Sequence, residues 1–546
     1  NNTSMGMCSL FANTTGEQNT AVGVCSLNAN TTGSRNVAFG RHALDTNVSG
    51  NSNTAIGDQS LFANTASNNT ALGFYSMADN TSGASNTGLG QNALSNNTTG
   101  NQNVAVGADS MVDNTTGCDN VALGDNALQK NTTGLDNVAL GANAIFTKTT
   151  GNGNIGIGRN ALYYTTTASS NVAIGYNAMV TNTTGATNTA IGNESLYSNT
   201  TGAENVAVGA DALKANTTGG GNTAIGMFAL DSNTTADNNS AFGNGVLGLN
   251  TTGANNTSVG YDALVKNTTG ANNVAVGATA LDESTTGTEN TAIGVNTLGH
   301  VTTGSYNTAV GKDAGRDYTT AASLVAIGHS ALRGNTTGSS NTAVGVDALI
   351  ANTTGTQNTA IGLGAGNLTT TGSNNIMIGK GSDADAVGTN NVIAMGENVV
   401  SILNAFTFGA GGNDSRIAFG ATSITAPSDM RLKEDIQDDT AGLSFINDLR
   451  PVTYKWRQEK DIPEEMRTHV AGSTKRYNND KVNHGFIAQE VKEAIDKHPE
   501  LKDGFDMWTE ESTMDGRQRV AEGALIPMLV KAIQELKAEI ELLKNK

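Results

Sequence analysis

The strongest constraint on the fold is a motif that recurs every 17 residues through most of the chain. Its consensus is Asn-Thr/Val-Ala-Val/Ile/Leu-Gly-x-x-Ala-Leu-x-x-Asn-Thr-Thr-Gly-x-x, and its first glycine occurs 24 times between Gly6 and Gly396. The only interval of 16 residues lies between Gly57 and Gly73. So strict a period is typical of a solenoid, in which each repeat forms one coil stacked on the previous one.

Each repeat contains its own strand and turn. Asn-Thr-Ala-Ile-Gly predicts a short strand with alternating faces, whereas recurrent glycine and Asn-Thr-Thr-Gly would break any long helix. In the turn we expect asparagine to tolerate left-handed geometry and glycine to take a positive φ. The turn asparagines should form an internal ladder, each amide bonding the coils above and below. Its members include Asn30, Asn97, Asn114 and Asn131.

The strands are apolar on both faces, which is usual for strands that are covered on both faces. Large residues such as Ile56 and Val106 alternate with small ones such as Ala55 and Ala105. We expect the large side chains to fill the core of the coil and the alanine row to let another chain approach. The alternative is a single-chain solenoid whose alanines line a thin interior.

The Asn-x-Ala-x-Gly units resemble the head repeats of trimeric autotransporter adhesins, although the period here is longer. The resemblance implies a parallel β-roll of three intertwined chains. Residues 1–396 would form this shaft, roughly 115 Å long at about 4.8 Å per coil. Residues 397–427, where the repeat fades, are expected to form irregular strands as a tapering β connector. A rigid spacer is the simplest role; ice binding through threonine rows and glycan cleavage by scattered carboxylates are weaker alternatives.

Composition changes abruptly after Pro427. Residues 1–427 contain 12 Lys+Arg and 25 Asp+Glu, and residues 428–546 contain 19 and 24. The net charge of −18 and the lack of basic patches argue against nucleic-acid or anionic-membrane partners. No apolar run reaches the roughly 18 residues of a membrane-spanning helix. We expect no metal and no cofactor, and we expect Cys8 and Cys25 to be free thiols in a stacked row.

The chain begins at Asn1, in the middle of a repeat. We therefore expect a fragment or a processed form whose upstream anchor is missing.

The C-terminal part predicts an α+β domain that ends in a coiled-coil helix. A strand is expected within 449–456, and a strand running into a helix within 484–491. Apolar residues then follow the 3,4 spacing of a coiled-coil seam over about three heptads of 526–543. The seam residues are Ile526, Leu529, Ile533, Leu536, Ile540 and Leu543. Alternating Ile and Leu favours dimers by the general rule, which leaves the oligomeric state open.

A second and closer resemblance to a known family rests on three motifs that follow one another in the C-terminal part. They are Ser428-Asp429-x-Arg431-x-Lys433, then Leu-Arg-Pro-Val-x-Tyr, then Gly-Phe-Ile-Ala-Gln-Glu-Val. With the terminal helix, residues 428–546 resemble the self-cleaving intramolecular chaperone domain of phage tail spikes and fibres, the endosialidase type. The resemblance implies a homotrimer whose shaft folds with help from this domain. The domain then cuts itself off between Pro427 and Ser428, with Ser428 as nucleophile, Lys433 as base, and Asp429 and Arg431 in support.

The chemistry of the residues agrees with this assignment. A serine directly after the scissile bond can attack the preceding carbonyl, and water can hydrolyse the resulting ester. A lysine acts as base only where burial lowers its pKa. Because residues five apart do not meet on an ideal helix or strand, the segment must bend or the base must act across chains. The alternative is that Ser428 and Asp429 simply cap a helix.

We therefore expect a homotrimeric viral tail fibre or spike that is folded by a domain with single-turnover autoproteolytic activity. Its partners would be itself and a glycan or protein receptor on a host or other cell surface. It would lie on the virion or outside the cell. The alternative is a bacterial cell-surface adhesin that uses the same assembly domain.

Overall fold

The fold is seen in a computed structural model that describes residues 1–411, 413–421, 424–425, 430, 433–464, 466, 468–501, 505, 507–510 and 518–545. The chain divides into two compact units, residues 1–427 and residues 428–546. The boundary between the units coincides with the change in charge content.

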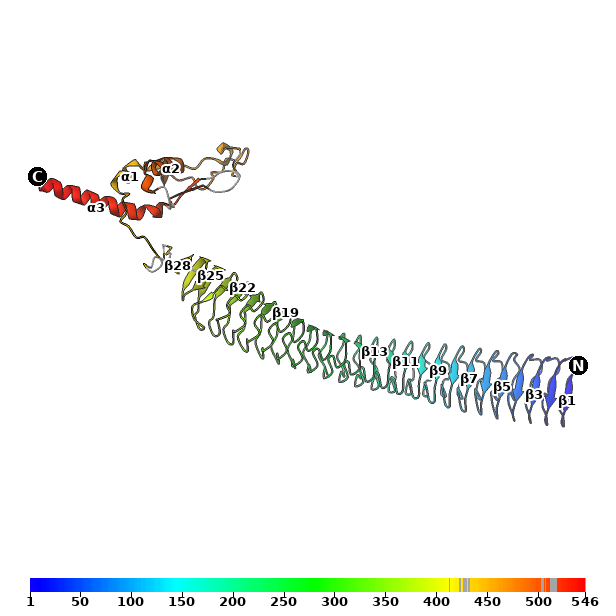
Figure 1. Cartoon of the computed structure of the whole chain (residues 1–546). Helices are drawn as coiled ribbons and strands as arrows, with labels where there is room; N and C mark the ends of the chain where they lie inside the picture. The colour runs from blue at the N-terminus through cyan, green and yellow to red at the C-terminus, as the bar shows by residue number, and fades with distance from the viewer. Residues whose placement is uncertain are drawn as a thin grey trace. The chain divides into compact units, whose positions relative to one another are not determined.

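The first unit is a parallel β-solenoid in which each 17-residue repeat forms one coil (Figure 1). Each coil contributes one three-residue strand to a single 26-stranded sheet. Consecutive strands pair in parallel with equivalent residues opposite each other, and this register holds across the 16-residue repeat, where Thr54 pairs with Thr70. The strands are β1 (Thr3–Met5), β2 (Thr20–Val22), β3 (Val37–Phe39), β4 (Thr54–Ile56), β5 (Thr70–Leu72), β6 (Thr87–Leu89), β7 (Val104–Val106), β8 (Val121–Leu123), β9 (Val138–Leu140), β10 (Ile155–Ile157), β11 (Val172–Ile174), β12 (Thr189–Ile191), β13 (Val206–Val208), β14 (Thr223–Ile225), β15 (Ser240–Phe242), β16 (Thr257–Val259), β17 (Val274–Val276), β18 (Thr291–Ile293), β19 (Thr308–Val310), β20 (Val325–Ile327), β21 (Thr342–Val344), β22 (Thr359–Ile361) and β23 (Ile376–Ile378).

The end of the shaft is more regular than the fading repeat predicted. Strands β25 (Val392–Glu397) and β27 (Ala405–Ala410) are six residues long and pair in parallel. Strand β28 (Asn413–Ala418) then pairs antiparallel with β27. A separate two-residue pair joins β24 (Asp383–Ala384) to β26 (Val400–Ser401). The strands therefore lengthen where the 17-residue pattern ends.

The interior of each coil is lined by alanine, so the prediction of which strand face is buried was wrong. The central alanines, such as Ala55 and Ala190, are fully buried. The large residues beside them point outward, and Ile56 is 36% exposed. The strand packs against the Ala-Leu segment that follows the next glycine, exemplified by Ala43 and Leu44. This thin interior has room for a methyl group in each strand and keeps the leucine as its one large side chain.

The predicted asparagine ladder is confirmed. Asn114 donates from Nδ2 to Asn97 Oδ1 at 2.7 Å, and Asn131 donates to Asn114 in the same way at 2.7 Å. The ladder is interrupted at Lys148 and Thr165, and again where Ser284, Val301 and Tyr318 replace asparagine. Buried amides that bond one another in series satisfy polar groups that would otherwise destabilise the interior.

A second ladder, which the repeat pattern did not predict, is formed by the asparagines that precede the strands. Asn36 donates its backbone N–H to Asn19 Oδ1 at 3.0 Å and its side-chain amide to the Gly50 carbonyl at 2.8 Å. Its side chain is completely buried. Most coils are thus joined to their neighbours at two internal amide positions as well as through the sheet.

The turn geometry also differs from the prediction. Neither Asn30 nor Gly33 of an Asn-Thr-Thr-Gly turn has a positive φ. Gly33 is required because a Cβ would lie 2.4 Å from Asn30 Oδ1. The left-handed residues lie elsewhere in the coil and include Leu27 and His42, with φ of 49° and 57°. Bonds between coils hold this uncommon conformation, such as His42 N–H to the Val24 carbonyl at 2.9 Å.

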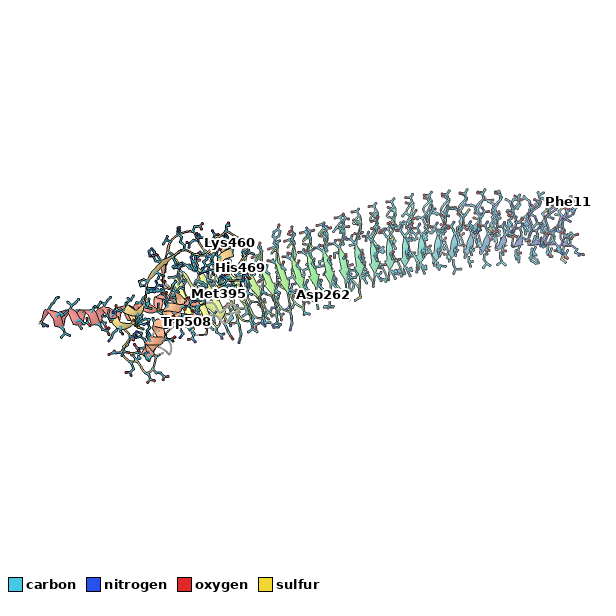
Figure 2. All side chains as sticks on the ribbon, turned by 90° about the horizontal axis from the view of Figure 1, so that it is seen from above. Phe11, Asp262, Met395, Lys460, His469 and Trp508 are labelled. Atoms are coloured by element: carbon cyan, nitrogen blue, oxygen red, sulfur yellow. The ribbon has the colours of Figure 1, made fainter. Side chains whose placement is uncertain are left out.

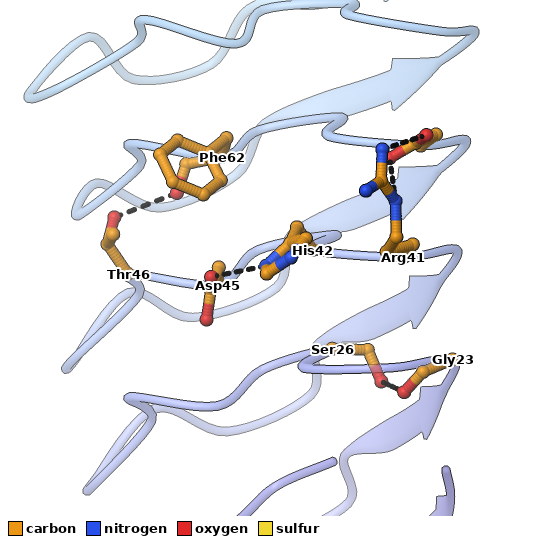
Figure 3. A network of polar contacts seen from close by, with 8 residues as sticks. Gly23, Ser26, Arg41, His42, Asp45, Thr46 and Phe62 are labelled. Atoms are coloured by element: carbon orange, nitrogen blue, oxygen red, sulfur yellow. Dashed lines mark hydrogen bonds and ion pairs between the residues drawn. The ribbon is translucent and has the colours of Figure 1, made fainter. Parts of the chain in front are cut away.

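Positions in a coil are numbered here from its strand-terminal glycine, so that position +5 is five residues after it. Figure 3 shows that the side chains at +2 and +5 lie side by side on the outside of the coil, where His42 and Asp45 bond at 2.8 Å. Thr46 at +6 bonds to the Phe62 carbonyl of the next coil, and Arg41 at +1 pairs with Asp58. Equivalent positions thus form columns along the shaft.

The second unit contains short helices and strands around a small apolar core. Its elements are α1 (Leu443–Asp448), β29 (Val452–Tyr454), η2 (Glu459–Asp461), β30 (Asn483–Gly485), α2 (Ala488–Lys497), η3 (Pro499–Leu501), β31 (Trp508–Glu510), β32 (Gln518–Val520), η4 (Glu522–Ala524) and α3 (Leu525–Lys544). Phe445, Val491 and Met507 are buried in its core. Figure 2 labels Trp508 in this unit. The predicted strand, strand-to-helix segment and terminal helix are all confirmed.

Candidate functional site: the junction and the assembly surfaces

The predicted cleavage site lies at the boundary between the two units. Pro427, Ser428, Asp429 and Arg431 lie outside the described residues, so their mutual geometry is not part of the structure described above. Lys433 is described, and it is exposed. Its backbone N–H donates to the Met430 carbonyl at 3.2 Å, which closes a turn of the chain.

Helix α3 has two apolar faces with different environments. One face, with Leu525, Met528 and Ala532, is buried against the second unit. From this side Glu535 also reaches the start of α1, where its carboxylate accepts the Leu443 N–H at 2.8 Å. A carboxylate at this place satisfies one of the free N–H groups of a helix N-terminus and interacts favourably with the helix dipole.

The other face of α3 is the predicted seam, and it is exposed along its whole length. Ile533 is 64% exposed and Ile540 is 50% exposed. The remaining seam residues, also exposed, are Ile526, Leu529, Leu536 and Leu543. A stripe of large aliphatic side chains of this length is typical of an association surface rather than of a free helix.

The shaft carries a second apolar surface, on the outer face of its sheet. The outward strand residues form two columns of Val, Ile, Leu, Phe and Thr, and none of strands β1–β23 contains a charged residue. Ile191 and Ile293 are 37% and 41% exposed. A continuous uncharged strip along the whole sheet far exceeds the isolated apolar residues that are usual on a monomer surface.

A buried histidine, whose pairing no local sequence pattern predicts, connects two segments of the second unit. His498 Nε2 lies 3.0 Å from Asp448 Oδ2, and its Nδ1 lies 3.0 Å from Glu500 Oε1. Burial alone lowers the pKa of His498, but the hydrogen bonds and charges of the two carboxylates outweigh it and raise that pKa above its ordinary value. His484, which directly precedes the Gly-Phe-Ile-Ala-Gln-Glu-Val motif, is exposed on β30 opposite Thr453.

Several other features of the sequence have a structural explanation. Asp383, one of the scattered shaft carboxylates, is nearly buried and accepts the N–H groups of Leu368 and Ala384. Cys8 and Cys25 are free thiols, as expected. Among the described residues, no three His, Cys, Asp or Glu side chains lie together as a metal site requires. Within the same part of the chain, no helix combines the length and apolarity needed to cross a bilayer.

The comparison with protein families gives one match. Residues 428–499 match the family described as chaperone of endosialidase, and the match begins at the first residue of the second unit. No curated protein and no solved structure matches the chain. A long β-solenoid shaft followed by this domain fits a tail-spike-like protein with a C-terminal chaperone domain. The chain is therefore a structural protein of the fibre or spike type.

Proposed function

We propose that three copies of this chain form a viral tail fibre or spike, assembled by the second unit and then released from it by self-cleavage. The observation that carries this proposal is the exposed seam of α3, whose residues need apolar partners. The family match supports three copies rather than the two that an Ile/Leu seam favours by the general rule.

In the assembled fibre, the outer sheet face of each shaft would pack against the other copies. Two observations support this arrangement: the face is uncharged, and its half-exposed aliphatic residues repeat in every coil. Because each coil presents the same columns, a threefold shaft would repeat one contact along its length. The second unit would hold three chains together while these long parallel pairings form, which is slow without a nucleus.

The cleavage would use only groups of the chain. Ser428 Oγ attacks the Pro427 carbonyl carbon while Lys433, which is exposed in the single chain and would have to be buried by assembly to act as a base, accepts the hydroxyl proton. The bond from Pro427 C to Ser428 N breaks, the Ser428 nitrogen takes up the proton from Lys433 and becomes a free amine, and an ester joins Pro427 to Ser428 Oγ. Water then hydrolyses the ester, leaving a carboxylate on Pro427 and restoring the serine. Asp429 and Arg431 would orient the two reacting residues, and no cofactor is needed.

Light scattering and mass spectrometry of the purified chain test the proposal. We expect an assembly of three chains, each of 55.8 kDa before cleavage, or three shafts that end at Pro427 after it. A monomeric full-length chain would contradict both the assembly and the release. The second candidate, a bacterial surface adhesin, is favoured by the Asn-x-Ala-x-Gly repeats alone. Antibodies against the shaft would label bacterial cells rather than purified virions if it is correct.

A further inference from the structure

Aromatic side chains gather on the outside of the shaft in two successive coils. Phe146 and Tyr163, both at position +5, stack with ring centroids 4.9 Å apart and an angle of 12° between the rings. Tyr164, at position +6, meets Tyr163 at 4.6 Å and 74°. Elsewhere along the shaft aromatic residues at these two positions, such as Phe11 near the N-terminal end in Figure 2, do not occur in successive coils.

The stack holds Tyr164 as an exposed platform. Because its ring stands nearly at a right angle to the stacked pair, Tyr164 does not take part in the stack, and it is 51% exposed. Lys130 lies over Phe146, with its ammonium 5.6 Å from the ring centroid. The ring of Tyr164 is thus held by an edge contact with Tyr163, and half of its surface is open to the solvent.

A column of amides lies beside the aromatic column. Asn143 donates to Asn160 at 3.3 Å, and Asn160 donates to Asn177 at 3.0 Å. These residues are at position +2, which is in bonding reach of position +5, as Gln129 and Asn126 demonstrate in the preceding coil at 2.8 Å. Each amide has two N–H groups and two lone pairs, so the column retains hydrogen-bonding capacity for a ligand.

Charge around the platform is low. No Asp or Glu occurs between residues 137 and 193, although the chain as a whole carries a net charge of −18. Lys130 is engaged with Phe146, and the next acidic residue along the chain, Glu194, is paired with Lys214. A ligand at this place would meet an aromatic ring and neutral amides, with no carboxylate to desolvate, and the exposed Arg159 at position +1 offers further N–H donors to its hydroxyl groups.

From this combination we infer that the coils of residues 141–177 form a binding subsite for a neutral oligosaccharide, with Tyr164 stacking on a pyranose ring. The apolar face of the sugar ring covers the aromatic ring, and its hydroxyl groups bond to the amides of Asn143, Asn160 and Asn177. The inference rests on the proposed role as an attachment fibre and names the class of receptor. The subsite lies on the segment that follows the strand-terminal glycine of each coil, and not on the outward residues of the strands. It therefore stays open if copies pack through the sheet.

The test is binding of the full chain to an immobilised panel of defined, neutral, linear oligosaccharides of hexoses and N-acetylhexosamines. We expect at least one to bind, and Tyr164→Ala should weaken that binding about tenfold or more. Tyr164→Phe, which keeps the ring, should bind nearly as wild type does. Leu249→Ala is the matched control, because Leu249 is also at position +6 and is also 51% exposed.

Several outcomes would overturn the inference: no binding to any neutral oligosaccharide, binding confined to acidic ones, or equal effects of Tyr164→Ala and Leu249→Ala. Light scattering on the same preparations separates this inference from the proposed function. A trimer that binds no oligosaccharide refutes the subsite alone, whereas a monomer that binds through Tyr164 refutes the trimer alone. Loss of the trimer in Tyr164→Ala would identify the patch as a contact between chains instead.

Discussion

Lys148 occupies a place in the asparagine ladder of the shaft, and its Nζ donates a hydrogen bond to the Gly151 carbonyl. The side chain is fully buried, and burial lowers its pKa to about 7 from an ordinary value near 10.5. The neighbouring ladder atoms Asn131 Oδ1 and Thr165 Oγ1 have no hydrogen-bond partner within the described residues. The ladder is therefore broken at this coil.

Replacing Lys148 by asparagine should stabilise the shaft, because an amide can bond Asn131 as the other ladder residues do. We expect a gain of about 1–2 kcal/mol in the free energy of unfolding. The wild-type shaft should also become more stable as pH rises from about 7 towards 10.5, because the unfolded chain binds the lysine proton more tightly than the folded one. Lys148→Asn should lose this dependence.

Urea unfolding followed by far-ultraviolet circular dichroism measures both effects. Lys266→Asn is the control, since Lys266 is half exposed and pairs with Glu283. An unchanged midpoint in Lys148→Asn, or an equal shift in the control, would show that the ladder position is not what matters.

The alanine column predicts opposite consequences for two adjacent residues. Ala190 is fully buried and Ile191 is 37% exposed. Ala190→Val should destabilise the shaft by about 1–3 kcal/mol, because the interior has no room for the added methyl groups. Ile191→Ala should leave the coil intact and weaken association of the shafts. Thermal unfolding and light scattering of both variants check this; similar melting temperatures for the two would contradict the assignment of the faces.

The pairing of His498 with Asp448 and Glu500 makes the second unit sensitive to pH. The pKa of His498 is raised in the folded state, so its contribution to stability is complete below the ordinary value near 6.5. That contribution is lost as pH rises through the folded pKa. Both tryptophans, Trp456 and Trp508, are in this unit, so their fluorescence reports its unfolding in the full chain.

We therefore expect a lower melting temperature at about pH 8.5 than at about pH 6, with a smaller difference in His498→Gln. His484→Gln is the control, because that ring is exposed on β30. If the wild type melted at the same temperature at both pH values, the carboxylate pair would not stabilise the charged ring.

Introducing charge into the α3 seam should prevent assembly. In Ile533→Asp with Ile540→Asp, like charges would face one another across the helices and the apolar contact would be lost. We expect no trimer and mostly insoluble chains, measured by sedimentation and light scattering. Gln534→Asp, which adds an acidic residue outside the seam, should assemble normally. A normal trimer yield from the seam variant would exclude α3 as the assembly device.

The autoproteolysis proposal predicts a separation of folding from cleavage. Ser428→Ala and Lys433→Ala should each give full-length chains that still assemble, whereas the wild type yields a small fragment that begins at Ser428. Lys455→Ala, an exposed lysine of the same unit, should cleave as the wild type does. Denaturing gels and N-terminal sequencing decide the matter, and a fragment beginning at another residue would remove Ser428 from the nucleophile role.

The sequence predicted those features that depend on spacing alone. The recurrence of Gly6 through Gly396 implied stacked coils, and the 3,4 pattern from Ile526 to Leu543 implied the terminal helix and its seam. Alternation in the strand could not say which face is buried, because Ala55 and Ile56 are both apolar. The alanine face is the buried one because the space between the strand and Leu44 is too thin for a second large side chain.

Other features depend on neighbours that lie far apart in the sequence. Leu27 is left-handed because bonds between coils hold it there, which local propensity opposes. Asp448 and His498 are 50 residues apart, so no local sequence pattern predicts their pairing. At the junction the prediction of the cleavage residues rests on the motif alone, because Ser428 and its immediate neighbours lie outside the described residues.

The repeat of 16 residues has a consequence for the length of the fibre. The Asn64 side chain bonds to the carbonyl two residues ahead, whereas the Asn30 side chain bonds to the carbonyl three residues ahead. The turn is therefore one residue shorter in this repeat. The strands on either side still pair residue for residue. Genetic gain or loss of a whole repeat would therefore preserve the strand register and the backbone contacts between coils. The reach of such a fibre can evolve in steps of about 4.8 Å, through slippage of the repeated gene segment.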